Sequence, residues 1–326
     1  MRAIVLEEHG GPEVLRLGEA PDPEPGPEEV LVAVATTAVN RADLLQRLGL
    51  YPGPPAPVEI PGMEFAGRVV AAGERVTRWS TGDEVMGIVA GGAYAERLVT
   101  HERQALPVPP AVGLRDAAAI PEVFLTAWDA LVLQGGLTAG RVALVHAGAS
   151  GVGTAAIQIA GALRARVVVT CSGGKRAACE ALGAERAVDH RSEDFVAAVR
   201  EQTGGVGVDV VLDVVGGDYL ARNVDALRVG GRIVQVGVMG GGTATFPLGA
   251  LLPKRATLVG TVLRGRPLEE KIALTQRFAR EVLPLFDDGV LRPVVDARFP
   301  LAEVAEAHRR LEANATVGKV LLDVQQ

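Results

Sequence analysis

The alternation of apolar and polar residues divides the chain into two parts with different periodicity. Up to about residue 115, short apolar runs are separated by turns rich in proline and glycine, such as PDPEPGP and YPGPPAP. This punctuation is typical of a small, mostly antiparallel β-barrel. The predicted strands cover residues 3–6, 30–39, 64–71, 84–89 and 95–100.

From residue 141 the apolar runs alternate with helical segments instead. This alternation produces βαβ units and therefore predicts an α/β domain with a doubly wound parallel sheet. Residues 116–135 are predicted to form a helical connector that leads into it. The predicted strands of the sheet lie at residues 142–145, 166–170, 187–189, 208–213, 232–237 and 257–263.

The tail of the chain is predicted to return to the first part. It contains a long helix at 268–287, a second helix at 301–312 and a strand at 319–324. Two helices and one strand cannot bury their apolar faces alone, so they must complete another layer. We therefore expect one domain made of residues 1–120 and 266–326, and a second made of residues 121–265.

Three glycines follow the first strand of the second part. The sequence RVALVHAGASGVG places Gly148, Gly151 and Gly153 between a buried strand and a helix of small residues. Glycines let the backbone approach a diphosphate closely, and the helix start offers unpaired N–H groups to it. The Gly-x-x-Gly-x-Gly spacing differs from the common Gly-x-Gly-x-x-Gly, and a purely structural turn is the alternative. A second strand one helix later favours a dinucleotide site.

The composition excludes several classes of protein. The formal charge of −6 argues against a nucleic-acid binder that works by neutralising phosphates. The two cysteines, Cys171 and Cys179, make neither a disulfide framework nor a four-cysteine zinc loop. No apolar run approaches the ~20 residues that span a bilayer, and the first residues lack the apolar segment of a signal peptide. We expect a cytoplasmic enzyme.

Ordered motifs along the whole chain carry a resemblance to a known family. They include VNRADLLQRLGLYPGPP, GMEFAGRVVAAGERVTRWSTGDEV, HAGASGVGTAAIQ, GVDVVLDVVGGDYL and LLPKRATLVGTVLRGR. The chain resembles the zinc-free branch of the medium-chain dehydrogenases/reductases, the quinone oxidoreductases related to zeta-crystallin. Within that branch it is most similar to the tumour-suppressor-inducible quinone oxidoreductases. The resemblance implies a GroES-like β-barrel catalytic domain and a Rossmann nucleotide-binding domain.

The loop after the second parallel strand predicts the choice of cofactor. An NAD-selective site places a carboxylate there, which accepts hydrogen bonds from the ribose 2′-hydroxyl. This chain has Ser172, two glycines, Lys175 and Arg176 instead, which suit a 2′-phosphate. The resemblance assigns Ser172 and Lys175 to that phosphate, and His190 stands where the family often has tyrosine. We therefore expect NADPH; the alternative is that Lys175 only begins a solvated helix.

The resemblance implies further contacts with the cofactor. The helix start, at Ser150, Gly151 and Val152, should meet the diphosphate. For Met239, filling a gap in the core is an alternative to contact. The remaining positions are Val215 and Gly216 on the adenine side, Val238, Met239, Gly240, Leu263 and Arg264 towards the nicotinamide, and Asn314 and Lys319 in the tail.

A catalytic zinc ion is not expected. Zinc-dependent relatives hold the metal with a cysteine and with the histidine and glutamate of a Gly-His-Glu triplet. Here the triplet reads Gly62-Met63-Glu64, and Asn40-Arg41-Ala42-Asp43 stands where the cysteine would lie. The five histidines have no ligand-like spacing. We expect Glu64 to be a structural partner in an ion pair or hydrogen bond.

Without a metal, the predicted chemistry is hydride transfer from C4 of the nicotinamide to a strong acceptor. A quinone fits, because its reduced product is a stabilised phenolate that water can protonate. By resemblance, the polar positions near the nicotinamide and the acceptor are Asn40, Asp43, Tyr51 and Thr126. Asn40 and Tyr51 are candidates to hydrogen-bond an acceptor carbonyl, and Thr126 to orient the carboxamide or ribose. A packing lid is the alternative for Tyr51.

Two other functions stay open. Reduction of an activated C=C bond in an enal, enone or enoyl thioester uses the same fold and cofactor, but needs a proton donor, for which Tyr51 is the only candidate. An NADPH-binding structural or RNA-contacting protein is the alternative of another class, against which the acidic charge argues. We also expect a homodimer, because the resemblance places strand 257–263 at a sheet edge that pairs with a second subunit. No nucleic-acid or membrane partner is expected.

Overall fold

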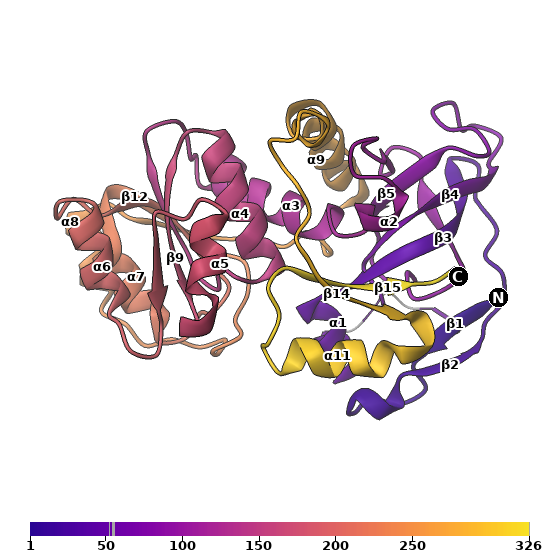
Figure 1. Cartoon of the computed structure of the whole chain (residues 1–326), viewed down its shortest axis with the longest axis horizontal. Coiled ribbons are helices and arrows are strands. Elements are labelled where there is room, and N and C mark those ends of the chain that lie inside the picture. Colours follow the sequence, from indigo (N-terminus) through magenta and orange to yellow (C-terminus); the bar gives the residue numbers. More distant parts are fainter. Residues whose placement is uncertain (52, 54–55, 326) are drawn as a thin grey trace. The chain divides into compact units, whose positions relative to one another are not determined.

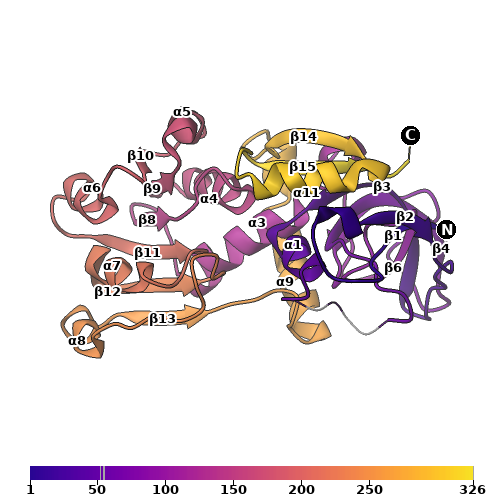
Figure 2. The ribbon, with the colours of Figure 1, turned by 90° about the horizontal axis from the view of Figure 1, so that it is seen from below.

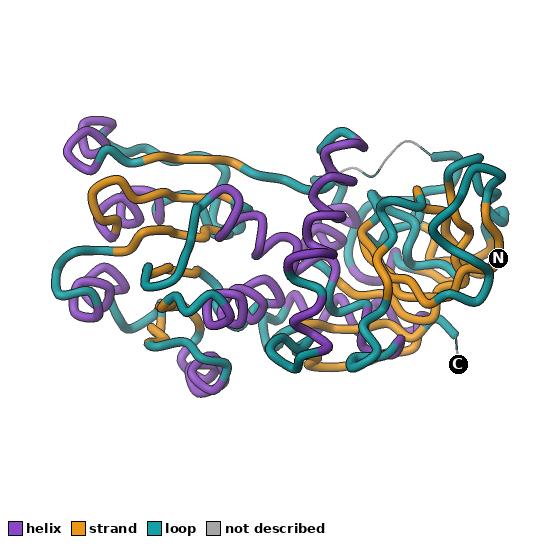
Figure 3. Tube along the Cα trace, turned by 90° about the horizontal axis from the view of Figure 1, so that it is seen from above, coloured by secondary structure: helices purple, strands orange, loops and turns teal. Residues whose placement is uncertain are grey.

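The computed structural model describes residues 1–51, 53 and 56–325. The chain forms two compact units, which are coloured along the sequence in Figure 1. Unit 1 comprises Met1–Leu125 and Arg264–Gln326, and unit 2 comprises Thr126–Leu263. The boundary falls within helix α3 (Pro121–Trp128). The predicted helical connector at 116–135 starts inside α2 (Leu114–Ala117) and contains α3 and a π-helical turn at Asp129–Gln134. Figure 3 contrasts the strands and long loops of unit 1 with the alternating strands and helices of unit 2.

Unit 2 is built on a parallel sheet of six strands. Figure 2 shows their order, β10-β9-β8-β11-β12-β13. The chain winds outward from β8 (Val142–Val145) through β9 (Arg166–Cys171) to β10 (Arg186–Asp189). It then starts again on the other side of β8 with β11 (Val208–Asp213), β12 (Leu227–Gln235) and β13 (Thr257–Gly260). This confirms the predicted doubly wound parallel sheet, and it places a topological switch point between β8 and β11.

Buried apolar strands and amphipathic helices form the core of unit 2. All four residues of β8 are buried, as expected for a strand covered on both faces. Leu144, Val168, Val211 and Ile233 pack with Phe195 in one cluster. The helices of the unit are α4 (Gly151–Ala162), α5 (Arg176–Ala181), α6 (Phe195–Gln202), α7 (Tyr219–Ala226) and α8 (Leu251–Lys254).

Unit 1 contains a mostly antiparallel sheet centred on β3 (Glu29–Val39). The main order is β14-β15-β3-β4-β5-β7, and β6 also pairs with β3. The predicted, mostly antiparallel barrel is confirmed in unit 1, although the β14–β15 pair is parallel. The other strands are β1 (Arg2–Val5), β2 (Arg16–Glu19), β4 (Glu64–Ala72), β5 (Glu84–Ile88), β6 (Arg97–His101), β7 (Leu106–Pro107), β14 (Val295–Pro300) and β15 (Lys319–Asp323).

The tail completes unit 1, as predicted. Strand β15 pairs antiparallel with β3, with Val320 opposite Val39, and α11 (Val304–Glu312) packs against β14 and β15 (Figure 1). The predicted single helix at 268–287 is wrong, because the structure has α9 (Leu268–Glu281) and then α10 (Pro284–Asp287). Pro284 has no N–H to continue the ladder of α9, so the helix ends before it. None of the helices in the described part of the chain is long and apolar enough to cross a membrane.

Candidate functional site

The glycine turn of unit 2 lies between β8 and α4, at the topological switch point. Ser150 caps α4, and its hydroxyl accepts a hydrogen bond from the Gly153 N–H at 3.0 Å. A Cβ atom at Gly148 would lie 2.5 Å from the Val169 side chain, and one at Gly153 would lie 2.4 Å from the Ala147 carbonyl oxygen. Both positions therefore require glycine: Gly148 because the turn packs against β9, and Gly153 because the helix start packs against the backbone of the turn.

The start of α4 is suited to an anion. The first turn of this helix carries no acidic residue. The N–H groups of Gly151 and Val152 are too close to the helix start to have an acceptor within the helix. Together with the helix dipole, such groups attract anions in general. The observed helix start is thus compatible with the diphosphate position that the motif predicts, which stays a prediction.

Residues from two neighbouring strands meet beside the predicted position of the 2′-phosphate. Ser172 follows β9, and His190, which is exposed, follows β10; the His190 N–H donates to the carbonyl of Cys171 at 3.1 Å. Lys175 ends the short segment that begins at Ser172, and it is half-buried. The structure therefore brings Ser172, Lys175 and His190 to one edge of the sheet.

A carboxylate that was not singled out in the sequence, Asp189, also lies at this edge. A Cβ atom at Gly173 would lie 2.8 Å from its Oδ2. The Arg191 N–H and the Ser192 hydroxyl donate to Asp189 at 3.1 and 2.9 Å, and these hydrogen bonds lower its pKa. Asp189 is therefore an ionised neighbour whose negative charge the cations of the loop must outweigh if a phosphate binds here.

The loops after β11 and β12 are hydrogen-bonded to each other. Met239 N–H donates to Val214 at 3.2 Å, and Gly240 N–H donates to Val215 at 2.7 Å. The predicted positions Val215, Gly216, Val238, Met239 and Gly240 are thus neighbours in space. Met239 is 51% exposed, so the alternative that it fills a gap in the core is wrong. Thr126 in α3 is 6% exposed, and half-buried Leu263 ends the unit.

In unit 1, a buried ion pair joins β15 to β4, and its hydrogen bonds extend to the end of β3. Lys319 Nζ lies 2.8 Å from Glu64 Oε1, and the two side chains are 4% and 0% exposed. Lys319 also donates to Asn40 Oδ1 at 2.5 Å, and Asn40 Nδ2 donates to Glu64 at 2.8 Å. The backbone N–H of Glu122 donates to the other oxygen of Glu64 at 2.8 Å. The prediction that Glu64 is a structural ion-pair partner is confirmed.

A second buried network in unit 1 ends on Asp43. This side chain is fully buried, and its Oδ2 accepts from the Asn40 N–H at 2.7 Å and from the Tyr94 hydroxyl at 3.2 Å. Tyr94 contacts His308 Nε2 at 3.2 Å, and Arg47 reaches the other ring nitrogen at 3.5 Å. Among the residues that the structure describes, Asp43 Oδ1 is the one buried side-chain oxygen or nitrogen without a hydrogen-bond partner.

Burial sets the protonation of this network. It raises the pKa of Asp43 to about 6, although the hydrogen bond from Asn40 and the charge of Lys319 act in the opposite direction. Burial, together with the nearby charge of Arg47, lowers the pKa of His308 to about 3, so the ring is neutral at pH 7. Arg47 therefore donates to Nδ1, Nε2–H donates to Tyr94, and Tyr94 donates to Asp43, which makes every hydrogen bond of the chain point towards Asp43.

The remaining predicted residues of unit 1 lie in two further groups. The Arg264 guanidinium lies over the Tyr51 ring, 4.8 Å from its centroid, and donates to Gln46 Oε1 at 3.0 Å. Burial raises the pKa of Tyr51, while the charge of Arg264 lowers it. Asn314 is exposed, has a φ of +50°, and accepts from Arg41 at 2.7 Å. The Tyr51 ring is thus engaged by a cation.

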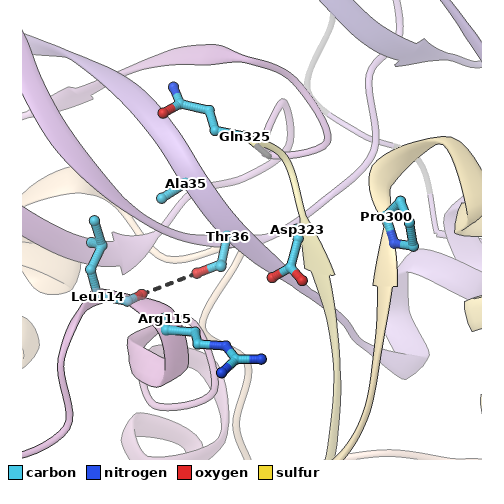
Figure 4. Close-up of a pocket in the computed structure, with 7 residues that line it drawn as sticks. All are labelled: Ala35, Thr36, Leu114, Arg115, Pro300, Asp323 and Gln325. Atoms are coloured by element: carbon cyan, nitrogen blue, oxygen red, sulfur yellow. Dashed lines mark hydrogen bonds between the residues drawn. The ribbon is translucent and has the colours of Figure 1, made fainter.

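Figure 4 shows a separate pocket within unit 1, of about 460 Å³, lined by residues of β3, α2, β14 and β15 and by Gln325. Thr36 donates to the carbonyl of Leu114 at 3.3 Å on its wall, and Arg115 and Asp323 lie at its sides. Its lining includes none of the predicted site residues. The pocket is therefore not part of the candidate site.

Comparisons with known proteins agree with this geometry. A family model for the alcohol dehydrogenase GroES-like domain matches residues 26–110, and one described as zinc-binding dehydrogenase matches residues 182–322. Quinone oxidoreductase of Lama guanicoe is 33% identical over 328 residues, which cover 99% of this chain and 97% of that protein. The chain belongs to the medium-chain dehydrogenase/reductase family.

Other relatives place this medium-chain dehydrogenase/reductase in the branch of the quinone oxidoreductases and VAT-1 homologs. The synaptic vesicle membrane protein VAT-1 homolog of Rattus norvegicus is 32% identical, covering 99% of this chain and 84% of that protein. Among solved structures, Escherichia coli quinone oxidoreductase complexed with NADPH superposes with a TM-score of 0.90 at 32% identity, covering 99% and 100% of the two chains. The CurF ER cyclopropanase of the curacin A pathway has a TM-score of 0.89 at 26% identity, covering 99% of each chain.

Within this family, the residues of the chain fit an NAD(P) cofactor. The uncharged start of α4 suits the diphosphate, and the three loops at the carboxyl ends of β8, β9 and β11 gather at the switch point where dinucleotides bind in such sheets. The zinc ligands of some relatives have no counterpart, since Met63 precedes Glu64 and Glu64 already pairs with Lys319. In the described residues, no three side chains of histidine, cysteine, aspartate or glutamate are grouped so as to hold a metal.

Proposed function

We propose that this medium-chain dehydrogenase/reductase is an NADPH-dependent quinone oxidoreductase that works without zinc. The observation that carries the proposal is the edge of unit 2 where Ser172, Lys175 and His190 meet beside a diphosphate turn. The four residues after β9 contain no carboxylate and one cation, which favours a 2′-phosphate over a free 2′-hydroxyl. Bound there, the cofactor supplies a hydride from its nicotinamide.

In this proposal the chain's own residues bind, orient and shield. Ser150, Gly151, Val152 and the glycines at 148 and 153 hold the diphosphate, while Val215, Gly216, Val238, Met239, Gly240 and Leu263 line the cofactor. The proposal assigns Asn40, Asp43 and Tyr51 of unit 1 and Thr126 of unit 2 to orienting the acceptor and the nicotinamide, with Arg264 and Asn314 as further cofactor contacts. Lys319 acts through Asn40, because its ammonium group is held by three acceptors inside unit 1.

The experiment that tests the proposal is stopped-flow oxidation of NADPH against a panel of acceptors. It consists of 1,4-benzoquinone, 9,10-phenanthrenequinone, an alkenal and crotonyl-CoA. Oxidation with the quinones alone supports the proposal, whereas oxidation with none of the acceptors would support an NADPH-binding structural or RNA-contacting protein. Activity that is lost on treatment with a strong chelator and restored by zinc would contradict the zinc-free mechanism.

Reduction of an activated C=C bond is the second candidate. The chain is similar to the CurF ER cyclopropanase, a protein of a biosynthetic pathway whose name does not refer to quinones. This similarity supports C=C reduction as an alternative function. This reaction needs a proton donor at carbon, and the Tyr51 hydroxyl, on a ring held by Arg264, is the candidate donor. Oxidation of NADPH with the alkenal or crotonyl-CoA alone, abolished in Tyr51→Phe, would establish it in place of quinone reduction.

We also infer a homodimer formed through β13, and a closer relation to the tumour-suppressor-inducible quinone oxidoreductases than to other members. Strand β13 ends the six-stranded sheet, and Leu258 on it and Val262 just beyond it are 48% and 51% exposed. An exposed apolar edge strand invites pairing with a second copy. A monomeric mass by light scattering at micromolar concentration would contradict the dimer.

A further inference from the structure

A buried histidine lies directly beneath the cofactor turn of unit 2. His146 follows β8, is 0% exposed and precedes Ala147, which has a φ of +56°. Its ring lies edge-on to the rings of Phe195 and Tyr219, at centroid distances of 4.9 and 4.8 Å. The ring is therefore held on its sides by aromatic packing, and only its two nitrogens remain for polar contacts.

Both nitrogens of His146 are hydrogen-bonded to neighbouring elements. Nδ1 lies 2.9 Å from the Thr170 hydroxyl, at the end of β9. Nε2 lies 2.7 Å from Asn223 Oδ1, on α7. The amide nitrogen of Asn223 then donates to Asp213 Oδ2 at 2.8 Å, at the end of β11. One continuous network thus joins the ends of three neighbouring strands.

The directions of these hydrogen bonds follow from Asp213. Its other oxygen accepts from the N–H groups of Val215 and Gly216 at 2.6 and 3.0 Å, so the carboxylate is an acceptor throughout. Asn223 must present its NH₂ to Asp213 and its oxygen to His146. His146 therefore carries its proton on Nε2. Burial lowers its pKa, so the ring is neutral and Nδ1 accepts from the Thr170 hydroxyl.

Each end of the network leads to a loop that the proposed function assigns to the cofactor. His146 adjoins the diphosphate turn, and the Thr170 carbonyl also accepts from the Gly148 N–H at 2.8 Å. Thr170 is two residues before Ser172, and Asp213 fixes the backbone of Val215 and Gly216. A fully satisfied buried network of this kind rigidifies the segments that it joins.

We propose that His146 is a positioning residue that holds the diphosphate turn, the 2′-phosphate loop and the adenine-side loop in one preformed arrangement for the dinucleotide. The proposal rests on the proposed cofactor site and not on the quinone. It identifies the tautomer with its proton on Nε2 as the one neutral form of the ring that satisfies Thr170 and Asn223 together. A preformed site avoids the cost of ordering three loops when the ligand binds.

The test is direct titration of NADPH and NADH by fluorescence, without any acceptor. His146→Phe keeps the ring packing and removes both hydrogen bonds; Val199→Ala is the matched control, because Val199 is fully buried in the same core and has no polar side chain. We expect His146→Phe to weaken NADPH binding at least about tenfold, and Val199→Ala to leave it within about twofold. Adenosine 2′,5′-bisphosphate carries a single 5′-phosphate in place of the diphosphate. His146→Phe should therefore lower its affinity less than that of NADPH.

Two results would overturn the inference. One is an NADPH affinity of the folded His146→Phe protein equal to that of the Val199→Ala control. The other, which does not depend on any variant, is a ¹⁵N NMR spectrum of the wild-type protein in which His146 is charged at pH 7 or carries its proton on Nδ1. Wild-type protein that binds NADPH but reduces no quinone would contradict the proposed substrate alone, and wild-type protein that binds neither nucleotide would contradict the cofactor site itself.

Discussion

The two units stabilise their buried polar groups in different ways. Unit 1 pairs the Glu64 carboxylate with the Lys319 ammonium group and leaves one oxygen of Asp43 without a partner. Unit 2 surrounds its buried carboxylate, Asp213, with N–H donors, and one of these donors, Asn223, also bonds the neutral ring of His146. A buried ion pair that loses one partner leaves an isolated charge, whereas loss of the neutral His146 ring leaves polar groups unpaired but keeps the donors to Asp213 in place. Substitutions in the buried networks of unit 1 should therefore mainly lower stability, and those in the network of unit 2 should mainly weaken ligand binding.

The largest effect is expected for the lysine of unit 1. Lys319→Met leaves the fully buried Glu64 carboxylate without its cation, and should lower the free energy of unfolding by about 3–5 kcal/mol. Urea denaturation monitored by circular dichroism measures this loss. The double variant Lys319→Met/Glu64→Gln removes both charges and should recover most of the stability. A single variant as stable as the wild type would show that the pair is not isolated from solvent.

The next effect concerns pH and Asp43. Its pKa of about 6 in the folded protein lies above the ordinary 3.8, so the folded state holds the proton more tightly. This favourable contribution is complete below pH 3.8 and is lost as the pH rises to 6, by about 3 kcal/mol for a difference of about two pKa units. Asp43→Asn cannot titrate. The difference in unfolding free energy between wild type and variant should therefore change over this window, and a constant difference would contradict the buried carboxyl.

Lys175 provides the matching test of a lysine in unit 2. It is half-buried on the loop after β9, so its loss should leave the stability nearly unchanged. Lys175→Ala should raise the KM for NADPH about 10- to 100-fold, because a hydrogen bond between charged groups contributes about 1.5–3 kcal/mol. The KM for NADH should not change. Arg200→Ala, which removes an exposed cation from α6, is the control for net charge; equal effects of Lys175→Ala on both nucleotides would refute the 2′-phosphate assignment.

The smallest effect is expected at the cap of α4. Ser150→Ala removes the acceptor for the Gly153 N–H and should lower stability by about 1 kcal/mol. Ser150→Asp restores a capping oxygen but adds a negative charge at the anion site. Thermal unfolding should thus rank Asp close to the wild type, while NADPH titration should rank it below Ala. The same order in both measurements would mean that the helix start is not the diphosphate site.

The sequence was most informative where one strand or loop carries the whole signal. The unbroken apolar run of β8 and the largely apolar segment of β11 predicted parallel strands with the observed bounds, and the glycine turn predicted the start of α4. Strand β14 was missed although its sequence, VDARFP, alternates apolar and polar residues; all six residues are partly buried, so this alternation does not separate a buried face from an exposed one. Strand β13 is shorter than predicted, since pairing with β12 ends at Gly260.

The networks around the candidate site were not predictable in the same way. Arg47, Tyr94 and His308 lie far apart in the sequence and form one chain only through the folded sheet and α11. His146 was visible next to the glycine turn, but its partners Thr170 and Asn223 come from two other elements. The spacing of these histidines in the sequence gave no sign of their neutral, hydrogen-bonded role. Predicting such roles needs the tertiary contacts.

The late arrival of β15 has a consequence for how the protein is made. The ribosome releases Glu64 long before Lys319, which is 255 residues further along the chain and supplies the neutralising ammonium group. During that interval the edge of β3 that will pair with β15 stays open, and open strand edges promote association between nascent chains. Unit 2, whose residues are contiguous, can finish folding first. Unit 1 therefore stays incomplete until β15 has been synthesised. A chain interrupted before β15 is the form most exposed to aggregation and to cellular proteases.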